Sequence, residues 1–149
     1  MLENFTRTQN LKLLSVVIMS DGSINFRGDG SPHSLRLLTS ESSKEQHKMF
    51  SFLSEKVFEK TPSISHKSNY LISNLFSVKA IREVLTLSPT FKTSPSLNQP
   101  NSSYLSLEQP TLSFLFHEPK DIKWAALRIY FDFDGSISPV FKLKKKRAV

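Results

Sequence analysis

Residues 14–24 read LSVVIMSDGSI, and residues 127–137 read LRIYFDFDGSI. Each stretch begins with apolar residues at helical spacing, continues into Asp-Gly-Ser-Ile, and is followed by alternating polar and apolar residues. An aspartate before a glycine is common in turns, so either copy alone carries little information. Two copies in the same context indicate an internal repeat, and each copy predicts a helix that turns sharply into a strand.

The chain around the first copy has the pattern of a helix, a strand, a turn and a second strand. Thr6 and Gln9 have the spacing of a capping box and predict the start of the helix, which ends at Asp21 and Gly22. Polar and apolar residues alternate in the two strands, so the apolar side chains share one face. We therefore expect a helix over residues 11–20 and strands over 23–27 and 33–40.

The same kinds of element follow further along the chain. Ser42 and Glu45 have capping-box spacing and predict the start of a second helix, which cannot continue past Pro62. From residue 91 to 110 the chain is rich in Ser, Pro and Asn, which indicates an irregular connector. The other expected elements are strands over 63–69 and 70–77, a helix over 78–87, a short buried segment over 111–116, a helix over 118–135 and a strand from 136.

The composition limits the class of protein. The 149 residues include 20 Lys and Arg against 13 Asp and Glu, a formal net charge of +7 that favours an anionic partner. The absence of cysteine excludes disulfide scaffolds, thiol nucleophiles and cysteine-ligated zinc. No apolar run is long enough to span a bilayer, and the N-terminus lacks the pattern of a secretory signal. We therefore expect a soluble intracellular protein, in the cytoplasm or an organelle, with no membrane partner.

The paired motif and the order of elements resemble the LAGLIDADG homing endonucleases. In the nine-residue motif frame, the first copy runs from Leu14 to Gly22 and the second from Leu127 to Gly135. The resemblance implies an α/β (α+β) fold built from an αββαββα half with a twisted antiparallel sheet. By this resemblance residues 1–115 form the first half, with its motif helix at 11–22. Residues 116–149 form the start of a second, truncated half, with its motif helix at 121–135.

The chain departs from the family pattern in the packing positions of the motif. The family usually has small residues at the second and third motif positions, so that the two motif helices pack closely. Here these positions hold Ser15 and Val16 in the first copy, and Arg128 and Ile129 in the second. Close packing therefore requires a register that is shifted toward the alanines at 125–126.

The resemblance also implies the catalytic residues. It places Asp21 and Asp134 at the ends of two parallel helices, next to each other across a pseudo-twofold axis, as catalytic and metal-binding residues. Carboxylates that hold Mg²⁺, or another divalent cation, can activate water and stabilise charge on a scissile phosphate. Lys92 is the expected basic residue near that phosphate. The simpler interpretation is that each aspartate favours its turn and that Lys92 is an ordinary solvated lysine.

DNA recognition would use the polar face of the strands. A twisted antiparallel ribbon fits the major groove, where arginine pairs with guanine and asparagine with adenine. The same residues would also suit the solvated side of a half-buried sheet, or a solvated basic tail at the C-terminus. The candidate DNA-binding residues are Asn25, Arg27, Ser34 and Arg36 in the first hairpin, His66, Lys67 and Asn69 in the second, and Lys142 and Lys144 near the C-terminus.

The resemblance implies an enzyme, a site-specific double-strand DNA endonuclease of the homing type that is encoded in an intron and hydrolyses phosphodiester bonds with Mg²⁺. Its partners would be double-stranded DNA and a second chain, or a C-terminal half, that completes the fold. One alternative is a catalytically inactive nucleic-acid binder with the same fold, either an RNA maturase or a regulator. A basic α/β interaction module without a nucleic-acid role is a further alternative.

Overall fold

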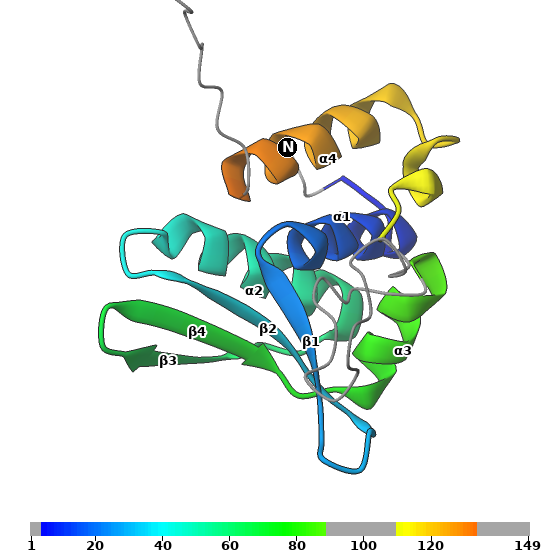
Figure 1. Cartoon of the computed structure of the whole chain (residues 1–149). Coiled ribbons are helices and arrows are strands. Elements are labelled where there is room, and N and C mark those ends of the chain that lie inside the picture. The colour runs from blue at the N-terminus through cyan, green and yellow to red at the C-terminus, as the bar shows by residue number, and fades with distance from the viewer. Residues whose placement is uncertain (1–3, 89–109, 134–149) are drawn as a thin grey trace, which may run out of the picture.

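The computed structural model describes residues 4–88 and 110–133 of the chain. These residues form a mixed α+β fold with a four-stranded antiparallel sheet and four α-helices (Figure 1). The elements within them are α1 (Arg7–Ser20), β1 (Gly22–Phe26), β2 (Pro32–Ser40), α2 (Lys44–Phe58), β3 (Ser63–Lys67), β4 (Tyr70–Leu75), α3 (Val78–Leu87), the short 3₁₀ helix η2 (Ser113–Leu115) and α4 (Lys120–Phe133).

The sheet has the strand order β1-β2-β4-β3, so the two hairpins join through β2 and β4. Leu35 of β2 pairs with Leu75 of β4, and both side chains are buried. Because side chains alternate along a strand, Leu37 points to the same face. α1 and α2 pack on this face, and α3 packs against β2 and α1 (Figure 1). The core therefore lies between the sheet and these helices, and it continues to the buried face of α4.

α1 lies between the sheet and α4, and this position explains its composition (Figure 1). All its residues from Asn10 to Ile18 are buried except Lys12. The predicted capping box at its start is confirmed, because Thr6 Oγ1 accepts a hydrogen bond from the Gln9 backbone N–H at 3.2 Å. In return, the Thr6 N–H donates to Gln9 Oε1 at 3.0 Å. A helix with partners on both sides is apolar nearly all round.

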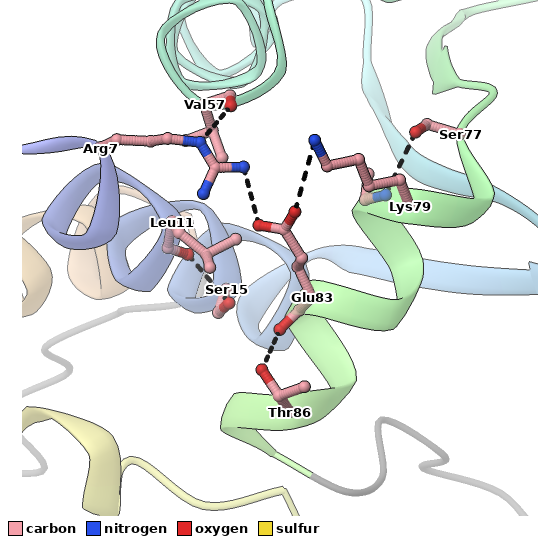
Figure 2. Close-up of polar contacts among 9 residues, drawn as sticks. Arg7, Leu11, Ser15, Val57, Ser77, Lys79, Glu83 and Thr86 are labelled. Atoms are coloured by element: carbon pink, nitrogen blue, oxygen red, sulfur yellow. Dashed lines mark hydrogen bonds and ion pairs between the residues drawn. The ribbon is translucent and has the colours of Figure 1, made fainter.

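Arg7, in the first turn of α1, joins three helices (Figure 2). Its Nε donates to the Val57 carbonyl oxygen at the end of α2, at 2.9 Å, and its Nη2 donates to Glu83 Oε2 of α3, at 2.8 Å. Lys79 Nζ lies 4.0 Å from the other carboxylate oxygen of Glu83, and the Arg7 guanidinium lies 5.6 Å from the centroid of the Phe58 ring. These contacts fix the end of α2 and the middle of α3 against the start of α1.

The bounds of the elements differ from the predicted ones by small amounts, except that α1 begins at Arg7 and not at residue 11. α3 has its predicted bounds, and the four strands differ from theirs by one or two residues at an end. The predicted capping box of Ser42 and Glu45 is wrong, because α2 has Ser43 as its N-cap. The hydroxyls of Ser42 and Ser43 instead hydrogen-bond with Ser40 Oγ, at 2.7 and 3.3 Å. The predicted connector over 91–110 and the strand from 136 lie almost wholly outside the described residues.

Candidate nucleic-acid interface and motif turn

The first Asp-Gly pair forms the tight turn between α1 and β1. Asp21 is the C-cap of α1, and its backbone N–H donates to the Val17 carbonyl oxygen at 3.3 Å. A Cβ atom on Gly22 would lie 2.6 Å from Cα of Ile18 and 3.0 Å from its carbonyl oxygen. Atoms that are not bonded do not approach so closely, so the turn requires glycine. The close approach leaves Asp21 partly buried at the end of α1.

The helix of the second motif copy, α4, packs against the helix of the first, α1. The two helices run in the same direction, and their C-terminal ends lie at the same end of the molecule (Figure 1). Lys12 of α1 forms an ion pair with Glu118, which precedes α4. At the other end of α4, Gln46 Nε2 of α2 donates to the Asp132 carbonyl oxygen at 2.9 Å. Both ends of α4 are thus tied to the helix layer.

The buried face of α4 includes the two alanines at 125–126. α4 buries Ile122, Ala125, Ala126 and Ile129, which share one face at helical spacing. Arg128 points away from this face, with a side chain that is 70% exposed and lies 3.7 Å from Asp132. Ile129, at the third motif position, is thus buried on the same face as the two alanines.

A second face of α4 is apolar and exposed. In an alignment of the two motif copies, three α4 residues correspond to three α1 residues. Trp124, Leu127 and Phe131 align with Leu11, Leu14 and Ile18. These α1 side chains are 7%, 0% and 1% exposed, because they face the sheet and its neighbouring helices. Their counterparts on α4 are 60%, 43% and 46% exposed. We call Trp124, Leu127 and Phe131 the α4 stripe; it is the face that, in α1, is covered by a sheet.

The sheet face opposite α1 and α2 carries most of the predicted DNA-binding residues of the two hairpins. Arg36 Nε donates to Asn74 Oδ1 at 3.0 Å, which joins β2 to β4. Asn25 Nδ2 donates to Ser34 Oγ at 3.2 Å, which joins β1 to β2. The strand register places Lys67 beside Tyr70 on this same face. Arg27 and Asn69 are exposed at the ends of the hairpins.

Two of the predicted DNA-binding residues are not exposed on this face of the sheet. His66 pairs with Leu71, whose side chain is buried on the helix face, so His66 points to the α2 side of the sheet. Its ring lies 3.8 Å from Glu41 there. The predicted face of His66 is therefore wrong, because pairing with β4 sets the face that each β3 side chain takes. Ser34 lies on the predicted face, but it is fully buried, so its expected exposure is also wrong.

Four predicted site residues lie outside the described residues: Lys92, Asp134, Lys142 and Lys144. Asp21 is the one member of the predicted metal site whose surroundings can be described. Within residues 4–88 and 110–133, no group of three or more Asp, Glu or His side chains could hold a metal ion. The carboxylate of Asp21 is a hard oxygen donor of the kind that Mg²⁺ prefers, so its chemistry fits that ion. Magnesium binding stays a prediction.

The buried imidazole of His47 joins α2 to two strands. His47 is 3% exposed, its Nε2 lies 2.8 Å from Thr39 Oγ1, and its Nδ1 lies 2.7 Å from Ser73 Oγ. Burial lowers the pKa of His47, because it disfavours the charged ring. Both ring nitrogens have hydroxyl partners, so this histidine holds the helix face of the sheet together.

The carboxylate of Glu118 also has a shifted pKa. The hydrogen bond and the charge of Lys12 lower the pKa of Glu118, and a hydrogen bond from Gln9 acts in the same direction. Both side chains of the Lys12–Glu118 pair are mostly buried, at 17% and 15% exposure. An ion pair that is shielded from solvent in this way contributes more to the stability of the fold than an exposed pair does.

Comparison with known proteins does not assign the chain to a family. No protein-family model matches it, and no curated protein matches it at a significant level. Within the described part of the chain, no helix is both long and apolar enough to cross a bilayer.

Sequence reasoning missed the α4 stripe and the network around His47. The stripe has a signal in the sequence, because apolar residues occur on all sides of the helix from 120 to 133, as they do in α1. The network of His47 has none, because Thr39 and Ser73 belong to different strands and are brought together by the register of β2 and β4.

Proposed function

We propose that the chain is a site-specific DNA endonuclease of the LAGLIDADG type. The observation that carries the proposal is the packing of the two motif helices, which run parallel and are in contact (Figure 1). Parallel helices of a repeated motif bring equivalent motif ends together. An aspartate at the end of each helix would then meet its counterpart, and Asp21 already stands at the end of α1.

The open face of the sheet supports DNA as the partner. Arg36, Asn25 and Lys67 lie on that face, and Arg27 is exposed beside it. Arginine and asparagine side chains on an antiparallel sheet are suited to base edges and to phosphates. The net charge of +7 favours the same partner, because cationic side chains release counterions from a nucleic acid.

The expected chemistry is the hydrolysis of phosphodiester bonds. Mg²⁺, when bound, would supply the charge that stabilises a pentavalent phosphate and lowers the pKa of a water molecule. In this chain Asp21 would hold it through carboxylate oxygen, together with Asp134, and Lys92 would neutralise phosphate charge. The rigid turn at Gly22 would fix the position of Asp21 relative to the sheet that holds the DNA.

The α4 stripe supports a second sheet as part of the complete molecule. Its residues correspond to Leu11, Leu14 and Ile18, which α1 buries in its own half. We therefore propose that a second unit of the same construction covers Trp124, Leu127 and Phe131. A second chain or a further stretch of polypeptide would supply it.

The test is cleavage of a plasmid pool that carries randomised inserts, with Mg²⁺ and with EDTA. We expect discrete double-strand cuts that require Mg²⁺ and that the Asp21→Asn, Asp134→Asn double variant abolishes. The matched control is Asp121→Asn, because Asp121 lies at the other end of α4. Salt-dependent binding without cuts would favour an inactive nucleic-acid binder instead. Absence of both cutting and binding would contradict the proposal.

A further inference from the structure

A groove lies between α2 and the edge strand β3, on the opposite side of the sheet from the proposed DNA face. It has a volume of about 500 Å³, within the range of ligand-binding clefts. Phe52 of α2, Ile64 of β3 and Leu71 of β4 give it an apolar lining. Ile64 is 52% exposed although it points to the helix face, because α2 does not extend over the last strand.

β3 forms one edge of the sheet, and all five of its residues are exposed. An edge strand presents unpaired backbone N–H and C=O groups along its free side. An extended peptide can pair with such an edge and place alternate side chains in an adjoining groove. The edge of β3 and the groove adjoin each other here, since Ile64 and His66 belong to both.

The charges around the groove differ between its two ends. Lys44, Lys48 and His66 line it near the start of α2, where the helix dipole adds positive potential. Glu55 lines the other end and accepts a hydrogen bond from Thr61 at 2.8 Å. A ligand with a carboxylate beside an apolar side chain matches this polarity.

Two ion pairs near the basic end would not prevent such a ligand from binding. Lys48 lies 2.6 Å from Glu45, but both side chains are more than 70% exposed, and exposed pairs of this kind exchange easily. His66 lies 3.8 Å from Glu41, with both side chains more than half exposed.

We propose that β3 and this groove form a docking site for an extended, acidic peptide segment of another protein. The segment pairs with β3 as a fifth strand, sets an apolar side chain against Phe52 and Ile64, and directs a carboxylate to Lys44 and Lys48. The site is independent of the proposed nuclease chemistry, because it uses the other face of the sheet. DNA can therefore be bound at the same time.

The test titrates the full ¹⁵N-labelled chain with a mixture of six-residue peptides in which glutamate stands two positions from valine, isoleucine or phenylalanine, with threonine between them, because side chains two positions apart share one face of a strand. We expect chemical-shift changes at residues 44–55 and 63–67, and slower hydrogen exchange of the β3 amides. The same peptides with alternate backbone nitrogens methylated should lose binding, because one edge of each peptide can no longer donate hydrogen bonds.

Variants separate the charge and the apolar contributions. Lys44→Glu with Lys48→Glu should raise the Kd by about tenfold or more, and so should Ile64→Lys. The matched control for charge is Lys120→Glu with Lys123→Glu at the start of α4, and the control for the apolar change is Leu38→Lys on the other sheet face. Circular dichroism of each variant checks that it is folded.

Three results would overturn the proposal. The first is the absence of shifts in these residues at millimolar peptide, and the second is equal binding of the methylated peptides. The third is binding of dodecanoate at the same residues without any binding of the peptides, which would make the groove a site for small amphiphiles.

Discussion

At the scale of single residues, Gly22 carries the most restrictive contact of the motif turn. Its missing side chain leaves the space that the backbone of Ile18 occupies, at 2.6 Å from where a Cβ would lie. We expect Gly22→Ala to lower the free energy of unfolding by about 1–3 kcal/mol, as an overpacked site does. Urea unfolding measures the change. Gly28→Ala is the control, because no atom lies within 4 Å of its Cβ position, and an equal loss there would contradict the explanation.

The lowered pKa of His47 predicts how the stability depends on pH. Its pKa is lowered in the folded chain, so the unfolded chain binds the proton more readily. The contribution of the neutral ring is fully present above about pH 6.5, the ordinary value, and is lost as the pH falls toward the lowered pKa. We expect urea unfolding to show lower stability at pH 5 than at pH 7.

A variant at each of two histidines assigns this effect. His47→Gln can still hydrogen-bond with Thr39 and Ser73 but does not titrate, so the difference in stability between pH 5 and pH 7 should shrink. His66→Gln changes an exposed ring and should leave that difference as it is. The same loss of pH dependence in both variants would show that His47 is not the group responsible.

At the scale of elements, the Lys12–Glu118 pair holds the start of α4 against α1. A double-mutant cycle with Lys12→Met and Glu118→Gln should give a coupling of about 1 kcal/mol at pH 7. The pKa of Glu118 is lowered in the folded chain from its ordinary value of 4.5, so the coupling is present above that pH and is lost as the pH falls through the lowered pKa. The exposed pair of Lys48 and Glu45 is the control, and its cycle should give less than about 0.5 kcal/mol.

The two faces of α4 should respond differently to polar substitution. Leu127→Gln and Phe131→Gln change exposed side chains of the α4 stripe, and we expect each to shift the free energy of unfolding by less than about 0.5 kcal/mol. Ile122→Gln and Ile129→Gln bury an amide against α1 and should each cost about 2 kcal/mol or more. Thermal or urea unfolding compares the four variants. Equal costs on both faces would show that the stripe is already packed.

At the scale of the whole molecule, the proposed DNA face should determine how binding depends on salt. Arg27→Ala and Arg36→Ala should each reduce the slope of log K against log salt by about 1 where the arginine contacts a phosphate. Arg128→Ala removes an arginine on α4, away from the sheet, and should leave the slope unchanged. Fluorescence anisotropy with a labelled duplex at several salt concentrations measures all three. A slope that Arg128 alone affects would place the DNA on another surface.

The sequence predicted most of the local features of the fold, with the capping box at Ser42 as an exception. The capping box at Thr6 and the bounds of α3 depend on residues a few positions apart, and both are confirmed. The face of His66 depends on its pairing with Leu71, and the burial of Ser34 on its surroundings in the folded chain, so neither could be derived from the pattern of its own strand.

The candidate site shows the same division. The position of Asp21 at the end of a helix follows from the Asp-Gly turn, which local sequence predicts. Which residues of α4 meet α1 follows from packing across more than a hundred residues. The sequence indicated a shift toward the alanines at 125–126, and both alanines are buried in the fold.

The burial of α1 on both sides has a consequence for synthesis of the chain on the ribosome. Gln9 and Lys12 point to Glu118, and the residues one turn further along the helix, Leu13 and Val16, share their side. α4, which covers that side, is made roughly a hundred residues after α1. A nascent chain that has already folded its sheet therefore exposes these two apolar side chains to solvent and to chaperones until α4 emerges.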